Sequence, residues 1–138
     1  MKIPVPVKGG NTPKLLTVPP FVVEGMDNNA CMTLKFVDIP YSKLDTVLAV
    51  SGDIIVGYAK AMFFCYQDKE LNEYKYNLFP LTVQMHGSPT LFDVHYYSFK
   101  LNKVLVLRGQ HLMADEYFVN PLNPITILRA EMIEHEPH

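Results

Sequence analysis

Apolar and polar residues alternate along most of the chain, a pattern typical of half-buried strands rather than helices. The alternating runs are rich in Val, Ile, Tyr and Phe, and short groups of Gly, Pro, Asn, Asp and Ser separate them. Strands are predicted over residues 30–38, 54–67, 74–85, 91–99, 103–108, 115–119 and 125–134. About seven or eight short strands at such close spacing favour an all-β domain.

One segment carries helix signals instead. Ser42 stands three positions before Asp45, the spacing of a capping box, and Gly52 lies where a helix commonly ends. The apolar residues between them share one helical face: Leu44, Val47 and Leu48. We therefore predict one short helix between Ser42 and Gly52.

The chain lacks the alternating strand and helix units of an α/β fold. The fold class predicted is mostly β: a single-domain β-sandwich, jelly-roll or immunoglobulin-like, or a small barrel. To this we add the short helix and an extended N-terminal arm. The arm is assigned to residues 1–20 and the β domain to residues 21–138.

Two of the predicted strands have unusual features. Residues 54–67 are apolar on both faces and only Lys60 interrupts them, so we expect a strand that is central in a sandwich or covered by a neighbouring subunit. Within residues 74–85, Pro80 cannot donate a ladder hydrogen bond, which indicates an edge position or a bulge.

The first twenty residues differ in composition from the rest, because they hold five of the eleven prolines and three lysines but no acidic residue. Proline fixes φ and biases the preceding residue toward extended backbone, so Ile3-Pro4-Val5-Pro6-Val7 is predicted to be extended. A solvated linker would carry polar residues between its prolines. The apolar residues of this arm are instead predicted to bind a partner: Ile3, Val5, Val7, Leu15, Leu16 and Val18.

Composition limits the class of protein. With 138 residues, 49% hydrophobic and 19% charged, the chain can bury one core, and general disorder is excluded. A formal net charge of −2 argues against direct nucleic-acid binding, which normally needs a basic surplus. The longest unbroken apolar run, residues 61–66, is far shorter than the ~20 residues of a membrane helix, so no membrane insertion is expected.

Charge is distributed unevenly between the two ends. The first 23 residues carry three lysines and no carboxylate, whereas residues 109–138 carry one arginine against five acidic residues. Such asymmetry would suit head-to-tail contact between copies, although a chance distribution of surface charges accounts for it equally well.

Two cysteines, Cys31 and Cys65, both fall in predicted strands. We expect both to be buried and reduced, as small hydrophobic residues in a reducing compartment. The first eight residues lack the apolar block of a signal peptide, which indicates a cytoplasmic start.

The best candidate for metal or acid–base chemistry is Asp93-Val94-His95, whose two polar side chains would share one strand face. With His86 and His111, a two-histidine, one-carboxylate site can be drawn, but the spacing is not diagnostic. The ordinary alternative is that Asp93 and His95 line the solvent face of a half-buried strand. Nucleophile elbows and phosphate-binding loops are missing from the sequence, so no enzyme activity and no cofactor are expected.

Three functions remain. The preferred one is a non-enzymatic structural subunit of a large symmetric assembly, a bacteriophage virion protein of the capsid decoration, neck or tail, which docks through its arm. It would bind copies of itself and other subunits, and would be located in the virion after assembly in the host cytoplasm, or else in the cytoplasm. The alternatives are a small β-barrel enzyme or binding protein for a metal or ligand near His86, Asp93 and His95, and a single-stranded nucleic-acid module, which the acidic composition disfavours.

Overall fold

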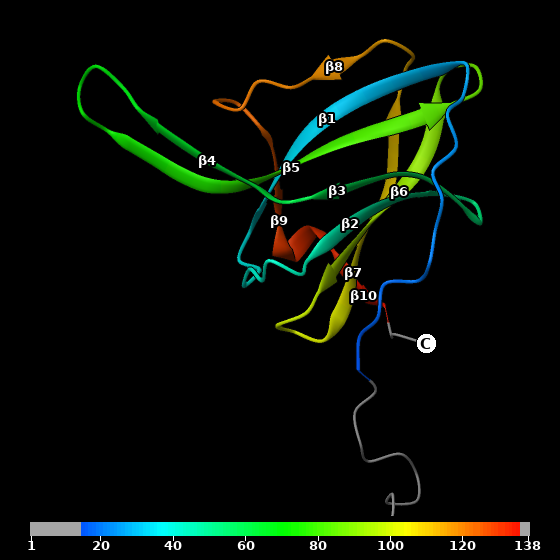
Figure 1. The fold of residues 1–138 in the computed structure, drawn as a ribbon, viewed down its shortest axis with the longest axis horizontal. Coiled ribbons are helices and arrows are strands. Elements are labelled where there is room, and N and C mark those ends of the chain that lie inside the picture. The colour runs from blue at the N-terminus through cyan, green and yellow to red at the C-terminus, as the bar shows by residue number, and fades with distance from the viewer. Residues whose placement is uncertain (1–14, 136–138) are drawn as a thin grey trace, which may run out of the picture.

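The computed structural model describes residues 15–135, which form ten strands and one 3₁₀ turn, so the predicted mostly β fold is confirmed (Figure 1). The elements in chain order are β1 (Asn28–Val37), β2 (Thr46–Ser51), β3 (Ile54–Lys60), β4 (Met62–Gln67), β5 (Glu73–Met85), β6 (Thr90–Ser98), β7 (Lys103–Leu112), β8 (Tyr117–Phe118), β9 (Ile125–Leu128), η1 (Arg129–Glu131) and β10 (Ile133–His135).

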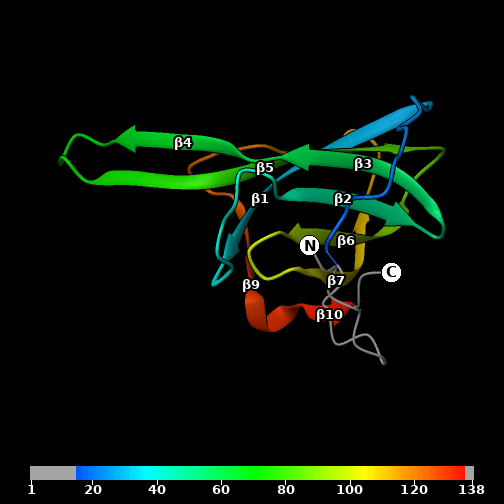
Figure 2. The same cartoon turned by 60° about the horizontal axis from the view of Figure 1, so that its bottom comes forward.

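The strands form two sheets that pack as a β-sandwich, seen as two layers in Figure 2. One sheet has the order β4-β5-β1-β8, with β9 also paired to β1, and the other has the order β10-β7-β6-β2-β3. Among the described residues these pairings leave both sheets open, so neither closes into a barrel.

The core between the sheets is built from the alternating apolar residues that predicted the strands. On β1 the buried positions are Ala30, Met32 and Leu34, two residues apart as a strand with one inward face requires. The same spacing recurs on β5, β2 and β6, and the side chains packed with those of β1 include Phe79, Leu81, Val83, Val47, Ala49, Val94 and Tyr96. Burial of this apolar surface is the main stabilising term of the fold.

The prediction of a helix between Ser42 and Gly52 is wrong, because this segment forms a turn followed by β2. The backbone N–H of Asp45 donates to the Ser42 carbonyl, and the Asp45 carboxylate accepts from the N–H of Ser42, so the expected capping residues close a turn. Strand β2 follows directly and pairs with both β3 and β6. Its β-branched residues favour strand, and its pairing on both sides outweighs a weak local helix preference.

The single strand predicted over residues 54–67 is divided at Ala61. Strand β3 ends one sheet and β4 ends the other, so the expected central position is wrong for both. The chain crosses between the two sheets here, which explains why neither face of the run is consistently polar.

Pro80 occupies the edge-like position predicted for it. Strand β5 pairs with β1 through Thr33 and Pro80, whereas its pairing with β4 on the other side ends at Leu78. A residue without an N–H is therefore placed where β4 no longer pairs with β5.

The C-terminal run predicted as one strand, residues 125–134, is interrupted. It forms β9 on the first sheet, the 3₁₀ turn η1, and then β10 on the second sheet. Lys103 of β7 donates to the Glu134 carboxylate of β10 at 2.7 Å, and Arg129 donates to the same oxygen at 3.2 Å. Lys103 thereby ties β10 to β7, and Arg129 ties it to η1.

Candidate interaction surface

Residues 15–26 form a strap without helix or strand that runs from the first sheet to the second (Figure 1). At one end the N–H of Met26 donates to the Gln84 side chain of β5 at 3.1 Å. At the other, the N–H of Leu16 donates to the Asn102 side chain at 2.7 Å. Between these ends the ring of Phe21 lies 5.3 Å from that of Tyr58 on β3.

Leu16 anchors the strap on the face of β7 that points away from the core. Its side chain is buried against Val104 and Val106, which form a small apolar cluster separate from the main core. Alternation along β7 explains the separation, because Leu105 between the two valines belongs to the main core.

The residues predicted to bind a partner therefore lie in different surroundings. Leu16 packs against its own chain, Leu15 is 82% exposed and Val18 is half-buried. Ile3, Val5 and Val7 lie outside the described residues. Partner binding by this set stays a prediction.

A two-stranded hairpin, made of β4 and the first part of β5, projects from the body of the sandwich (Figures 1 and 2). Six consecutive pairs run from Met62 opposite Leu78 to Gln67 opposite Glu73, without a bulge. The connecting turn is closed by the Asp68 carboxylate, which accepts hydrogen bonds from the backbone N–H groups of Glu70 and Asn72.

The Asp68 carboxylate also accepts from the Asn72 side chain, at 3.1 Å. Desolvation acts to raise the pKa of Asp68, but the hydrogen bonds from Asn72 and Glu70 stabilise the charged form and lower the pKa below its usual value. The hairpin loop is thus closed by hydrogen bonds to an ionised side chain.

One side of the hairpin carries four aromatic rings, which we call the aromatic face: Phe64, Tyr66, Tyr74 and Tyr76. Neighbouring ring centroids lie 5.3–6.4 Å apart, within the range of favourable aromatic pairs. The Tyr76 hydroxyl donates to the Pro121 carbonyl at 2.7 Å, and Lys35 lies 4.4 Å from the Tyr76 ring centroid. The base of the aromatic face is thereby tied to the body, while Tyr66 and Tyr74 near the tip are exposed.

The outer edge of β4 has no paired strand among the described residues. Its six residues, Met-Phe-Phe-Cys-Tyr-Gln, include no charge and no proline, and five of the six are exposed. Phe63, on the side opposite the aromatic face, is 63% exposed. Exposed apolar strand edges without a charge or a proline attract further strands.

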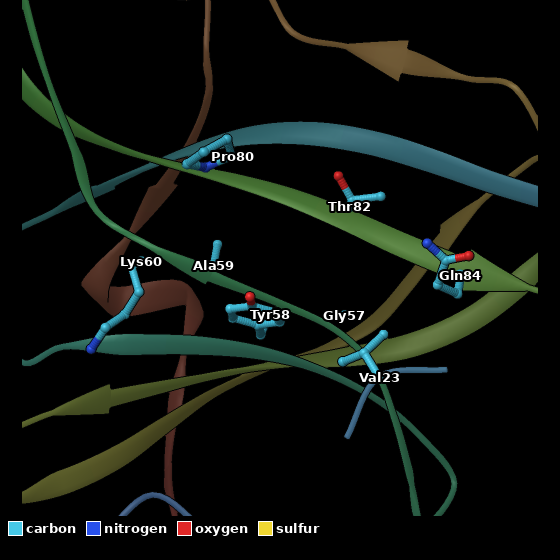
Figure 3. A pocket seen from close by; sticks show the side chains of 8 residues that line it. All are labelled: Val23, Gly57, Tyr58, Ala59, Lys60, Pro80, Thr82 and Gln84. Atoms are coloured by element: carbon cyan, nitrogen blue, oxygen red, sulfur yellow. The ribbon is translucent and has the colours of Figure 1, made fainter. Parts of the chain in front are cut away.

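A cleft of about 550 Å³ lies between β3 and β5, next to the strap (Figure 3). Its lining comprises Val23, Gly57, Tyr58, Ala59, Lys60, Pro80, Thr82 and Gln84. The Lys60 ammonium donates to the Leu44 carbonyl and the Thr46 hydroxyl, at 3.2 and 3.0 Å. A lysine held in this way is not placed to act as a base or nucleophile in the cleft.

The histidines and the aspartate proposed for metal binding do not form a site. His86 lies in an exposed turn, 3.5 Å from Asp27, and Asp93 accepts a hydrogen bond from the N–H of Gly109 at 3.0 Å. His95 is half-buried on β6, with its ring centroid 6.2 Å from that of His135. Across residues 15–135 there is no group of three or more His, Cys, Asp or Glu side chains able to hold a metal ion.

Burial lowers the pKa of His95, although Asp93 acts in the opposite direction. The side chain is therefore neutral at physiological pH. This agrees with the ordinary interpretation of a half-buried strand residue.

The two cysteines differ from the expectation that both are buried. Cys31 is half-buried, with its sulfur 3.2 Å from the Thr82 hydroxyl, whereas Cys65 is exposed on β4. Both are free thiols. Cys65 is exposed because its strand belongs to the projecting hairpin and not to the core.

Comparison of the chain with protein-family models, with curated proteins and with solved structures found no match. Within the part of the chain that the structure describes, no helix has the length and apolar character needed to cross a membrane. The interpretation of function therefore depends on the surface itself.

The sequence indicated part of this surface. The two apolar faces of residues 54–67 suggested cover by a neighbouring subunit, but the pattern did not separate the body strand β3 from the projecting strand β4. The polar residues 67–72 between two predicted strands do indicate a hairpin loop, and the structure confirms antiparallel pairing across it. The pattern does not indicate that the hairpin projects from the body.

Proposed function

We propose that this protein is a non-enzymatic structural subunit of a large symmetric assembly, built from copies of itself and other subunits. The observation that carries the proposal is the projecting hairpin, whose strand β4 is uncharged and exposed. We further propose that the assembly is a bacteriophage virion, in which the protein is a capsid decoration, neck or tail component put together in the host cytoplasm.

The hairpin supports assembly because it is poorly suited to exist in water alone. A two-stranded hairpin is at best marginally stable unless a further strand or another element covers it. Here the part beyond the sandwich exposes Phe63, Cys65, Tyr66 and Tyr74. Aromatic residues and Met are enriched in the centre of protein interfaces, where charged residues are depleted, and β4 has that composition.

The virion assignment draws on the architecture as a whole. A small β-sandwich with a proline-rich apolar arm and a projecting hairpin offers several separate contact points to neighbours, as a subunit in a closed symmetric shell or ring requires. The lack of nucleophile and phosphate-binding motifs in the sequence supports a passive role.

The test is the solution mass of the full chain and of Phe63→Lys, measured by size-exclusion chromatography with light scattering. A charge placed in the centre of a buried apolar interface should weaken association by about tenfold or more. The full chain is expected to form a discrete oligomer, and Phe63→Lys is expected to dissociate at concentrations where the full chain remains assembled.

Leu91→Lys is the matched control, because Leu91 is a similarly exposed apolar residue on β6 in the other sheet. It should assemble as the full chain does. Equal assembly by Phe63→Lys and Leu91→Lys would contradict a role for the hairpin.

A further inference from the structure

We infer that the outer edge of β4 is covered by residues 3–7 of a second copy, which add to it as a further strand. The inference rests on the proposed function and names the contact through which one copy binds the next.

The acceptor is the least protected strand edge in the described part of the chain. Proteins protect edges with charges, prolines, bulges, short strands or covering segments. Strand β10 has three residues and carries Glu134 in two ion pairs, β8 has two residues and β9 has four, and β3 is flanked by the strap at Phe21. Strand β4 has six residues in unbroken register and none of these protections.

The donor follows from the order of prolines in the arm. Along a strand, the N–H and C=O of alternate residues point to the same edge. Ile3, Val5 and Val7 would direct their N–H groups to one edge, and Pro4 and Pro6, which have none, would face the other. Such a segment can pair on one side and end the sheet on its other side, as prolines on edge strands do.

Side-chain chemistry agrees with this pairing. Alternation places Ile3, Val5 and Val7 on one face of the added strand and the two proline rings on the other. On either face they would meet an apolar or aromatic surface, either Phe63 or the aromatic face. The prolines also reduce the conformational entropy lost when the arm becomes ordered.

The charges of the arm and of the hairpin are complementary. The arm contributes Lys2 and Lys8 beside its apolar segment and no carboxylate. The hairpin loop and the start of β5 carry three carboxylates, Asp68, Glu70 and Glu73, against two lysines. Opposite charges of this kind steer the encounter and favour one register over another.

The position of the strap favours a second copy over the same chain. Leu16 is fixed on the outer face of β7 in the second sheet, while β4 is the last strand of the first sheet. Figure 1 shows the hairpin projecting on the side of the molecule away from the strap. The seven residues that separate Val7 from Leu15 could span at most about 25–30 Å when extended, which limits how far from the second sheet residues 3–7 can lie.

Disulfide trapping between two differently tagged copies tests the inference, because β4 already carries an exposed thiol at Cys65. Both copies carry Cys31→Ser. The donor copy also carries Cys65→Ser and one new cysteine at one of the five positions 3–7, so that both faces of the added strand are sampled, while the acceptor copy keeps Cys65. Under mild oxidation, a donor–acceptor dimer is expected for at least one of the five, since only directly opposed strand residues meet disulfide geometry.

Thr17→Cys in the donor is the matched control, because Thr17 is exposed on the strap next to the anchored Leu16. Its yield of donor–acceptor dimer should be at least tenfold lower than that of the best arm position. Circular dichroism and the measured solution mass of each variant establish that it is folded and assembled.

Four outcomes would overturn the inference. Trapping at none of the arm positions in an oligomer of normal mass would refute this contact and leave assembly standing. Acceptor–acceptor dimers through Cys65 as the main product would instead assign the edge to a second β4. A Val5→Cys protein that keeps Cys65 could also form a disulfide quickly within one chain at low concentration. That result would assign the edge of β4 to the molecule's own arm. A chain that is monomeric at every concentration would refute the proposed function and this inference together.

Discussion

Asp45 is the most deeply buried charged side chain in the described part of the molecule, at 1% exposure, and its surroundings explain how it is accommodated. Its carboxylate accepts from the Tyr96 hydroxyl at 2.6 Å and from the backbone N–H groups of Phe99 and Ser42 at 2.9 and 3.1 Å. A buried carboxylate is tolerated only when its oxygens are hydrogen-bonded. The sequence suggested only the local pairing of Asp45 with Ser42, whereas Tyr96 and Phe99 lie 51 and 54 positions away.

Replacing Tyr96 by Phe should lower the free energy of unfolding by about 1.5–3 kcal/mol, since a hydrogen bond to a charged group is lost in the core. The measurement is urea unfolding at pH 8. Tyr97→Phe on the same strand is the control, because Tyr97 packs near Leu16 on the opposite face, and it should cost less.

Wild type and Tyr96→Phe can also be compared for the pH dependence of their stability. Burial, and then the hydrogen bond to Asp45, raise the pKa of Tyr96 above its ordinary value of 10.0. The folded protein therefore keeps this proton at pH values where the unfolded chain releases it, so stability present below pH 10 is lost as the pH rises above 10. Wild type should lose stability more steeply than Tyr96→Phe between about pH 10 and 11; parallel curves would contradict this.

At the scale of elements, β3 of one sheet lies close against β5 of the other at Gly57. A Cβ atom at this position would meet the backbone carbonyl of Thr82 on β5. Backbone cannot move aside as a flexible side chain can, so β3 must shift to admit any larger residue. Only glycine allows β3 to lie this close to the backbone of β5.

Gly57→Ala is expected to destabilise the protein by about 1–3 kcal/mol, as overpacking does elsewhere. Thermal or urea unfolding would measure the change. Gly25→Ala is the matched control, because Gly25 has open space around its Cβ position and should change stability by no more than about 0.5 kcal/mol. Equal effects at the two glycines would show that β3 and β5 do not meet as described.

Elements also show what the sequence could predict. Alternation located β1, β5 and β6 to within about two residues, because each has one inward face and so obeys a local rule. It failed at β2, where pairing with strands far along the chain overrides a local helix signal, and at Ala61, where the run changes sheet. Neither the pairing of β2 nor the change of sheet at Ala61 can be predicted from a few neighbouring residues.

The same reasoning applies to the candidate sites. The spacing of Asp93 and His95 correctly placed both on β6, but sequence could not reveal that Asp93 is engaged by Gly109 or that His86 lies with Asp27. The arrangement of four aromatic residues on a hairpin outside the core depends on where the chain leaves the sandwich, which the alternation of residues does not reveal.

At the scale of the whole molecule, residues 15–135 form a body with its own core, from which the hairpin of β4 and β5 projects. The main core draws on strands of both sheets, and the strap closes the outer face of β7 through Leu16. Removing residues 1–14 retains this anchor, whereas removing residues 1–20 would also expose Val104 and Val106. The shorter deletion is therefore the better probe of the arm.

Deletion of residues 1–14 should leave the free energy of unfolding within about 0.5 kcal/mol of the full chain, because the buried contacts of residues 15–135 are retained. Circular dichroism and urea unfolding would measure this. A deletion that unfolds the domain would contradict the separation of arm and body.

Sedimentation equilibrium of the full chain, over about a hundredfold range of concentration and beside the deletion of residues 1–14, tests the central claim of assembly most directly. We predict that the full chain sediments as a discrete oligomer and that the deletion variant sediments as a folded monomer at the same concentrations. A full chain that remains monomeric over the whole range would contradict the account.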